Sequence, residues 1–301
     1  MSSEELSAVL ALLGQARGDD HREKPIWQQR GEMEMTGLAM PMPEEPVDVQ
    51  HARMNGVPAL KFVPDGATGE SALLYMHGGG YVLGSPASHR HLVARLAADA
   101  GMVAWSIDYR LAPEFAYPAA VDDALEAYRY LLDQGIDASN IVVGGDSAGG
   151  GLATALLVAL KAEGLPQPGG AILLSPWVDL TQSGGTYESR ADVDPMVQKE
   201  GLDEMAAAYV QVGDTAAATA SPLFADLTGL APMYIQVGDA ETLLSDSLRL
   251  AENAKAAGVD VRLDHYPEMI HVWPYFWPML SEAREACSKL AGYCAEHSTA
   301  G

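Results

Sequence analysis

Short apolar runs alternate with helical segments along most of the chain, and this alternation restricts the fold more than any other feature. The pattern starts at Ala59. The apolar runs are nearly continuous, at Leu73–Met76, Met102–Ile107, Ile141–Val143, Ala171–Leu174, Met233–Val237 and Val261–Leu263. Helical periodicity marks the segments His89–Ala100, Pro118–Gln134, Ala148–Glu163, Ser245–Ala257 and Pro278–Glu296. Strands of this type are buried on both faces, so the sequence predicts an α/β fold with a mostly parallel central sheet flanked by helices.

Two segments depart from this alternation. Residues 1–45 precede it, and in them we expect an amphipathic helix at Glu4–Ala16, opened by a capping box of Ser2 and Glu5, then an irregular stretch at Met33–Pro46. Residues 181–229 interrupt it and contain one helical piece, Gly201–Val210. An insertion at the strand ends would form a lid, because loops at that edge carry function. We therefore predict a catalytic domain at 46–301 with a lid at about 181–229, and residues 1–45 as the N-terminal part of a helical cap.

Composition excludes several classes of partner. The chain of 301 residues has 18 Lys and Arg against 41 Asp and Glu, a formal charge of 18 − 41 = −23. Such a charge repels nucleic acid and anionic membrane surfaces, and it disfavours anionic substrates. The acidic start does not suit a secretory signal, and no apolar run approaches the roughly 18 residues of a spanning helix. We expect a cytoplasmic protein without integral membrane association.

The cysteines and the known metal-binding patterns point away from disulfides and metals. Cys287 and Cys294 are seven residues apart in a helical pattern, about 10 Å of rise, which is too far for a disulfide within one helix. The sequence has neither C-x-x-C nor H-E-x-x-H. We predict no metal site and no cofactor.

A serine follows the third of these apolar runs. Gly145-Asp146-Ser147-Ala148-Gly149 lies between the run Ile141–Val143 and the helical segment Ala148–Glu163. A strand, a sharp turn with small neighbours and a helix form a nucleophile elbow, and the helix start adds N–H groups that stabilise an oxyanion. A glycine-rich turn with a purely structural role would explain the glycines but not a serine at the apex. The pattern favours Ser147 as a nucleophile.

A second glycine-rich stretch, His77-Gly78-Gly79-Gly80, follows the first apolar run. Successive glycines leave backbone N–H groups unobstructed, as an oxyanion hole requires. A flexible loop is the alternative. The combination with the serine turn 67 residues later is much more specific than either half.

With these motifs the chain resembles the hormone-sensitive-lipase-like esterases, bacterial family IV of the α/β-hydrolases. The resemblance rests on His77-Gly78-Gly79-Gly80-Tyr81, Asp108-Tyr109-Arg110-Leu111-Ala112-Pro113-Glu114, Tyr117-Pro118-Ala119-Ala120 and Gly145-Asp146-Ser147-Ala148-Gly149-Gly150. The order and spacing of these motifs agree with those of the family from about residue 55 to the end of the chain. The resemblance implies an α/β-hydrolase with a two-part cap.

The resemblance also implies roles for individual residues. The oxyanion donors would be the backbone N–H groups of Gly79, Gly80 and Ala148. His77 would hold its loop, Asp146 would have no catalytic part, and a buried polar brace would lie beneath the site, formed by Asp108, Arg110 and Glu114.

The base and the acid of a triad follow the serine in this fold, the acid first. His271 lies in the loop beyond the last apolar run, whereas His265 falls within that strand, so we favour His271 as the base. After Met233–Val237, the family register places Glu241 at the acid position and Thr242 where proline is usual in relatives. Asp239 is the rival acid, and Asp246 is expected to cap the next helix.

These residues predict a serine carboxylesterase that acts on a small-molecule ester through an acyl-enzyme. Tyr81, Trp177 and the methionines of the cap, of which Met40 is one with Met33, Met35 and Met42, are candidates to line an acyl pocket. A compact cap favours short to medium acyl chains. The alternatives are an amidase, lactonase or deacetylase with the same triad, or a non-catalytic binding protein. A homodimer through the last strand, near Val261–Tyr266, also stays open.

Overall fold

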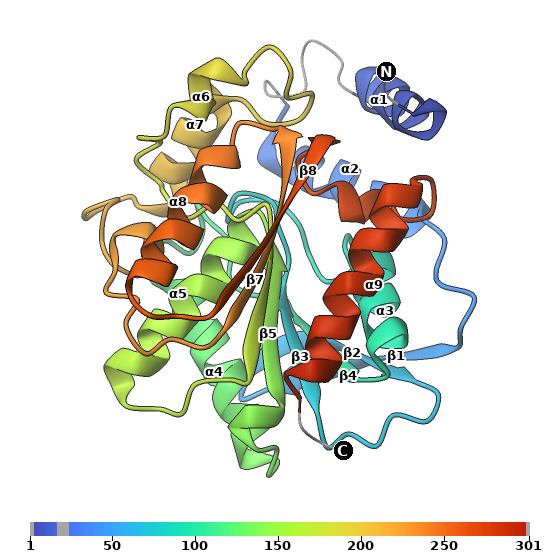
Figure 1. The fold of residues 1–301 in the computed structure, drawn as a ribbon, viewed down its shortest axis with the longest axis vertical. Coiled ribbons are helices and arrows are strands. Elements are labelled where there is room, and N and C mark those ends of the chain that lie inside the picture. The colour runs from blue at the N-terminus through green and yellow to red at the C-terminus, as the bar shows by residue number, and fades with distance from the viewer. Residues whose placement is uncertain (1–2, 17–23, 299–301) are drawn as a thin grey trace.

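One sheet runs through the centre of the protein (Figure 1) in the computed structural model, which describes residues 3–16 and 24–298. The described strands form a single eight-stranded sheet in the order β1-β2-β4-β3-β5-β6-β7-β8. Neighbours from β4 to β8 pair in parallel, and β2 is antiparallel to both β1 and β4. The strands are β1 (Val47–Met54), β2 (Val57–Pro64), β3 (Ala72–Met76), β4 (Val103–Ile107), β5 (Ile141–Asp146), β6 (Gly170–Leu174), β7 (Met233–Ala240) and β8 (Val261–Ile270). The predicted α/β fold with a mostly parallel sheet is confirmed.

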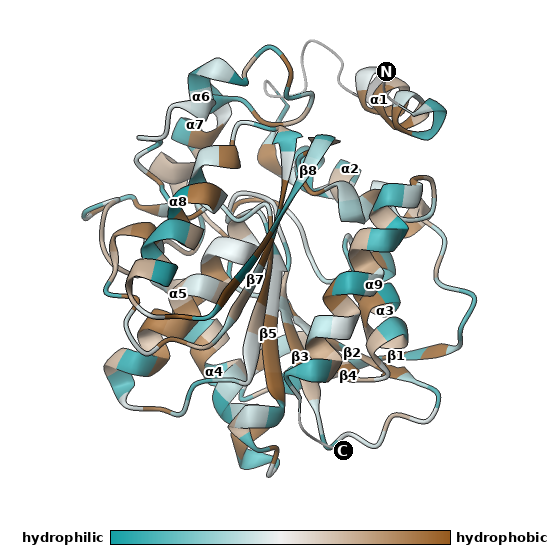
Figure 2. Cartoon of the chain, viewed as in Figure 1, coloured by the Kyte–Doolittle hydropathy of each residue, from teal (hydrophilic) through white to brown (hydrophobic). Residues whose placement is uncertain are grey.

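Helices cover both faces of this sheet, as the buried strands require. On one face lie α3 (Arg90–Ala100) and α9 (Ser281–Glu296); on the other lie α4 (Ala119–Asp133), α5 (Ala148–Glu163) and α8 (Leu244–Ala256) (Figure 1). Alternate residues of β3 enter different cores, since Leu74 packs with α4 and α5 whereas Leu73 packs with α3 and α9. Figure 2 shows the central strands as hydrophobic and the outer helix faces as hydrophilic.

The hairpin of β1 and β2 was not predicted, because the alternation was traced only from Ala59. Asn55 and Gly56 form its turn with positive φ values of 48° and 95°. Asn-Gly is the preferred pair for a two-residue hairpin turn, since both positions need this conformation. The Asn55-Gly56 dipeptide is therefore the sequence signal from which these two strands could have been predicted.

The N-terminal segment is more helical than expected. Helix α1 (Glu4–Ala16) has the predicted bounds, and Ser3 Oγ accepts a hydrogen bond from the Leu6 N–H at 3.0 Å; Ser2 lies outside the described residues. The expectation of an irregular stretch at Met33–Pro46 is wrong for its first half, because α2 (Ile26–Ala39) extends to Ala39, and it holds for residues 40–46, which form neither helix nor strand. Arg30 anchors α2 by donating to the carbonyl oxygens of Val82 and Ala112, both at 2.8 Å.

Residues 181–229 lie between β6 and β7 and contain α6 (Thr186–Ser189), α7 (Lys199–Tyr209) and η3 (Pro222–Phe224). The predicted piece Gly201–Val210 corresponds to α7. Figure 1 shows α6 and α7, together with α1 and α2, at the end of the molecule where the parallel strands finish. These segments are therefore placed over the edge at which open α/β sheets bind ligands.

Two short helices, η2 (Ala138–Asn140) and η4 (Trp273–Phe276), lie before β5 and after β8. Strand β8 is an edge of the sheet. Among the helices described, none combines the length and the apolar character that crossing a lipid bilayer requires.

Candidate active site

Ser147 lies at the sharp turn between β5 and α5. Its φ of 54° and ψ of −123° are unusual for a residue with a side chain, and such strain is concentrated at functional sites. The turn fits closely against β3, since a Cβ on Gly149 would lie 2.0 Å from the Met76 carbonyl oxygen. The Ser147 N–H donates to the Leu174 carbonyl oxygen at 2.8 Å, which fixes the turn to the end of β6. These are the features of a nucleophile elbow.

Strand pairing brings Glu241 and His271 together. Ala240 of β7 pairs with Ile270 of β8, so the residues that follow leave the sheet side by side. The register shifts between Gly238 and Ala240, and irregularities of this kind redirect side chains next to functional sites. His271 Nδ1 lies 3.0 Å from Glu241 Oε2, and both side chains are buried.

The charged forms of Glu241 and His271 stabilise each other. Burial lowers the pKa of His271, but the hydrogen bond and charge of Glu241, followed by the charges of Asp194 and Asp146, raise it to a net value above normal. Burial raises the pKa of Glu241, and the hydrogen bond and charge of His271 offset part of that rise. With the proton on Nδ1 in this hydrogen bond, Nε2 is left as the basic nitrogen of the imidazole.

The end of β6 connects the serine turn to the histidine loop. Leu174 receives the hydrogen bond from Ser147, and the next residue, Ser175, accepts one at its Oγ from the Val272 N–H at 3.1 Å. Within the part of the chain that is described, no hydrogen bond joins Ser147 Oγ to His271. Catalytic hydrogen bonds are often long in the absence of substrate. The structure thus brings Glu241 and His271 into contact, with the turn of Ser147 held next to the loop of His271.

The glycine loop after β3 is held against the elbow by Asp146. This buried carboxylate accepts hydrogen bonds from the Gly78 N–H at 3.1 Å and from the Tyr75 hydroxyl at 2.8 Å, and it pairs with His89 at 3.2 Å. Burial raises the pKa of Asp146, but the charge and hydrogen bond of His89 outweigh it and the net shift is downward. Sequence reasoning gave Asp146 no catalytic role and missed this structural one.

The three predicted oxyanion donors lie on either side of the elbow. Gly79 and Gly80 have φ values of 118° and 64°, which only glycine adopts readily. No carbonyl oxygen of the described residues accepts from the Gly79 or Gly80 N–H. Ala148 is the first residue of α5, where backbone N–H groups have no partner within the helix. Among the described residues, no backbone carbonyl takes up any of these three N–H groups.

A methionine of α7 covers this loop. A Cβ on Gly80 would lie 2.0 Å from Met205 Sδ, so the thioether packs directly on the glycine. The segment between β6 and β7 thereby contacts the candidate oxyanion loop. Met205 was not among the methionines considered from the sequence.

The alternative triad residues have other partners. Asp239 is 37% exposed and binds Arg190 at 2.8 Å and His265 at 3.4 Å. The prediction that Asp246 caps its own helix is wrong. Its carboxylate instead accepts from the backbone N–H groups of Val178 and Asp179, each at 3.0 Å, because the start of α8 is buried against that loop.

The polar brace implied by the resemblance is not buried beneath the site. Asp108, Arg110 and Glu114 are exposed. Arg110 pairs with Asp123 at 2.8 Å, and Glu114 pairs with Arg30 at 2.7 Å. The chain leaves the end of β4 along the surface here, so these residues connect surface elements to one another.

The predicted substrate-binding residues are buried. The Tyr81 ring stacks on that of Tyr209, with 3.9 Å between centroids, and lies 6.1 Å from the Trp177 ring. Met40 is 9% exposed and belongs to the core on the α3 and α9 side. The methionines do not form one lining, because Met35 is 67% exposed, Met33 packs against the core on the α4 and α5 side, and Met42 packs against the same core as Met40.

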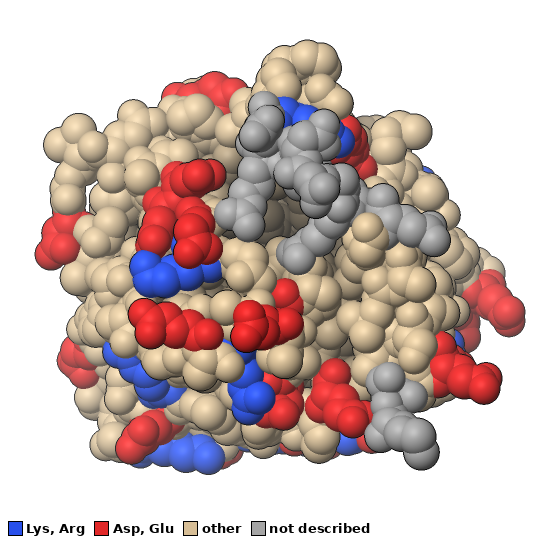
Figure 3. Space-filling model, turned by 90° about the horizontal axis from the view of Figure 1, so that it is seen from above, with Lys and Arg blue, Asp and Glu red and all other residues tan. Residues whose placement is uncertain are grey.

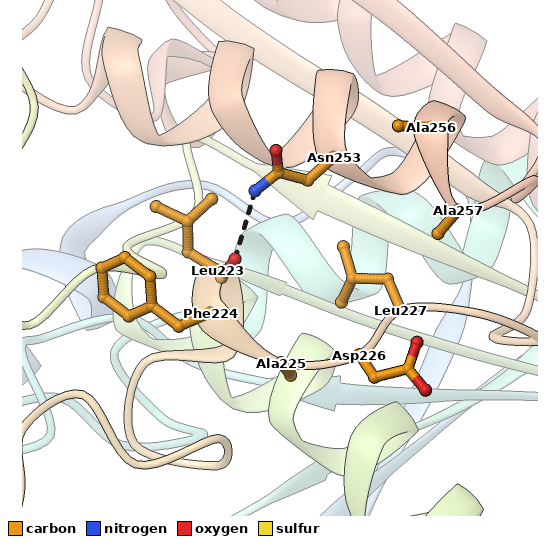
Figure 4. Close-up of a pocket in the computed structure, with 8 residues that line it drawn as sticks. All are labelled: Leu223, Phe224, Ala225, Asp226, Leu227, Asn253, Ala256 and Ala257. Atoms are coloured by element: carbon orange, nitrogen blue, oxygen red, sulfur yellow. Dashed lines mark hydrogen bonds between the residues drawn. The ribbon is translucent and has the colours of Figure 1, made fainter.

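A surface pocket between η3 and α8 (Figure 4) is lined by none of these residues. Its lining contains neither a nucleophile nor a histidine: Leu223, Phe224, Ala225, Asp226, Leu227, Asn253, Ala256 and Ala257. It has no chemistry in common with the elbow. Among residues 3–16 and 24–298 there is also no cluster of histidine, cysteine and carboxylate side chains suited to a metal ion.

Figure 3 shows the face above the strand ends, where groups of acidic side chains are interspersed with fewer Lys and Arg. The negative net charge is thus visible on the side of the molecule that carries the candidate site.

Comparison with known proteins agrees with this geometry. A family model described as alpha/beta hydrolase fold matches residues 73–275. An acetyl-hydrolase of Streptomyces hygroscopicus is 40% identical over 95% of this chain and 94% of its own length. An esterase of Acinetobacter venetianus is 36% identical over 83% of both chains.

Solved structures of related proteins superpose on this protein over almost the whole chain. An esterase from the bacterial hormone-sensitive lipase family superposes with a TM-score of 0.94, at 40% identity and with 99% of each chain covered. A hormone-sensitive lipase from a metagenome library gives a TM-score of 0.92 at 39% identity, covering 99% of this chain and 100% of its own. The fold and the site define an α/β-hydrolase that acts on carboxylic esters. The chain belongs to the bacterial hormone-sensitive lipase family of esterases.

Proposed function

We propose that this esterase works through a serine–histidine–glutamate triad. His271 Nε2 takes the proton from Ser147 Oγ as that oxygen attacks the ester carbonyl, and Glu241 orients the imidazole and stabilises its charged form. The N–H groups of Gly79, Gly80 and Ala148 bind the oxyanion. The alcohol leaves with the proton from His271, and water then releases the acid from the acyl-enzyme by the same steps. No metal or cofactor takes part.

The contact between Glu241 and His271 is the observation that supports this proposal most. Both side chains are buried, they are 3.0 Å apart, and they follow directly on the paired residues Ala240 and Ile270. A buried carboxylate in this position fixes the ring and its tautomer, which is the role of the acid in a triad. The strained turn of Ser147 and the unpaired N–H groups around it supply the remaining parts.

We also propose that residues 1–45 and 181–229 form a cap that limits the acyl chain. The contact of Met205 with Gly80 brings α7 to the oxyanion loop, and Arg30 ties α2 to the residues that follow that loop. A site covered in this way suits short to medium acyl groups. The acetyl-hydrolase relative supports the same preference.

A series of p-nitrophenyl esters from acetate to palmitate tests the chain-length preference. We expect kcat/KM to be highest among the short to medium chains and to fall steeply beyond them, because a longer chain must displace the cap. The measurement is the initial rate of p-nitrophenol release below substrate saturation. A maximum at palmitate would contradict the proposed cap.

Labelling with a fluorophosphonate tests the triad itself. We expect one phosphonyl group per chain, bound to Ser147 and located by peptide mass spectrometry, because only an activated serine reacts at neutral pH. Denatured protein serves as the control and should not react. Labelling of another residue, or none, would contradict the proposal.

A further inference from the structure

One buried carboxylate close to the site has no part in the mechanism above. Asp194 lies between α6 and α7 and is 4% exposed. Its Oδ1 accepts from the N–H groups of Met196 and Val197, at 2.7 and 2.8 Å. Its Oδ2 accepts from the N–H of Thr242 at 2.8 Å and from the Thr242 hydroxyl at 3.2 Å. One side chain thus closes the turn before α7 and also holds a residue far away in the sequence.

That distant residue is next to the proposed triad acid. Thr242 follows Glu241 directly, and its other hydrogen bonds among the described residues involve the same segment: its carbonyl oxygen accepts from the Thr186 hydroxyl at 2.7 Å, and its hydroxyl lies 3.4 Å from the Val197 carbonyl oxygen. By contrast, the only hydrogen bond from the strand β7 to the Glu241 carboxylate is a long one, from the Gly238 N–H at 3.3 Å. The turn that carries Glu241 is therefore held largely by residues between β6 and α7. A proline at 242 could not form the bond to Asp194, because it has no N–H.

The charge of Asp194 also acts on the pair. The charges of carboxylates on three elements raise the pKa of His271: Glu241 from the turn before α8, which is in contact with the ring, and then Asp194 from the segment before α7 and Asp146 from the end of β5. The negative charge of Asp194 raises the pKa of His271 and that of Glu241. Its link to the pair runs through the backbone, since the Thr242 N–H that it binds at 2.8 Å belongs to the residue after Glu241.

We propose that Asp194 is a positioning residue of the esterase, which fixes the turn of Glu241 and Thr242 against the segment leading into α7. The position of that segment then determines in part how the Glu241 and His271 side chains are oriented. This inference rests on the proposed function, in which that pair activates Ser147.

Asp194→Asn in the full-length enzyme tests the inference, since it removes the charge with little change of shape. We expect kcat for p-nitrophenyl acetate to fall roughly tenfold with KM nearly unchanged. The reason is that an amide accepts the hydrogen bonds from Thr242 more weakly than a carboxylate does, so the turn that carries Glu241 is held less firmly. The rate needs the neutral form of His271, and removal of a negative charge lowers its pKa. The acidic limb of the kcat/KM profile should therefore move to lower pH. Asp192→Asn is the matched control: it removes the same charge from an exposed site in the same segment and should leave both kcat and the limb in place.

A second variant, Thr242→Pro, tests the inference even if the Asp194→Asn protein does not fold. Thr242→Pro removes both donors to Oδ2 but leaves Asp194 and its bonds to Met196 and Val197, so kcat should fall without a shift of the limb to lower pH. A well-folded Asp194→Asn with the wild-type kcat and profile would overturn the inference. If Asp194→Asn does not fold, a wild-type kcat in Thr242→Pro would overturn it instead. Fluorophosphonate labelling of the wild type separates the two hypotheses: without labelling at Ser147 the proposed function fails, and with it only the role of Asp194 is at issue.

Discussion

Ser147→Ala is expected to lower kcat/KM for p-nitrophenyl acetate by roughly 10⁴- to 10⁶-fold, the range found when the nucleophile of such a triad is removed. The alanine keeps the oxyanion donors and the histidine but has no oxygen that can form the acyl-enzyme. The measurement is p-nitrophenol release at high enzyme concentration, corrected for the uncatalysed rate.

The same substitution should leave the fold intact. Ser147 is partly buried, and its backbone bond to Leu174 does not involve the side chain. Alanine meets the same strain at φ 54° as serine does, so the melting temperature should change little. Ser189→Ala, at an exposed site of α6, is the matched control and should keep full activity. Turnover within tenfold of the wild type in a folded Ser147→Ala would show that another group carries the reaction.

The sequence was most informative where local patterns coincide with the fold. The buried runs of β3 to β7 and the helices between them follow from hydrophobic periodicity alone, and α5 begins and ends at the residues predicted. Ser147 and His271 were selected because their motifs follow strands whose ends meet at one edge of a sheet, whereas Glu241 was selected from the register of the family that the chain resembles. The roles of these residues remain predictions, and the choice of Glu241 over Asp239 depended on that register.

Two of the wrong predictions, those for α2 and Asp246, have a common physical origin. Helix α2 has no clear apolar stripe, since Trp27 and Met35 are exposed, and it is held by tertiary bonds such as those of Arg30. Asp246 has the sequence position of a capping residue, but burial of α8 directs it to the backbone of Val178. Neither contact leaves a trace in the local sequence.

Asp194 is the clearest example of this limit. Its bond to Thr242 spans 48 residues and joins an irregular segment to a turn, and neither element has a periodic pattern. Composition offers no help, because Asp194 is one of 41 acidic residues. Only the folded structure distinguishes a buried carboxylate that accepts three backbone N–H groups from one at the surface.

The second large effect concerns the acid of the triad. Glu241→Gln is expected to lower kcat by roughly 10³- to 10⁴-fold, the scale of replacing a triad carboxylate by an amide that stabilises the wrong histidine tautomer. Loss of its charge also lowers the pKa of His271, so the acidic limb of the residual activity should lie at lower pH than in the wild type. The pH dependence of kcat/KM for p-nitrophenyl acetate measures both effects.

Asp239→Asn is the matched comparison, because the two carboxylates are two residues apart and were rivals for the same role. Asp239 lies against Arg190 and His265 at a partly exposed site, where an ion pair contributes at most about 1 kcal/mol to stability. We expect turnover within a few-fold of the wild type and no shift of the limb. The reverse result, near-normal turnover in Glu241→Gln and a loss of several powers of ten in Asp239→Asn, would mean that the acid is assigned in the wrong register.

Glu241→Asp refines the comparison: it retains the charge but is one methylene shorter, so it should lose part of the rate because its carboxylate no longer reaches His271 Nδ1 at 3.0 Å.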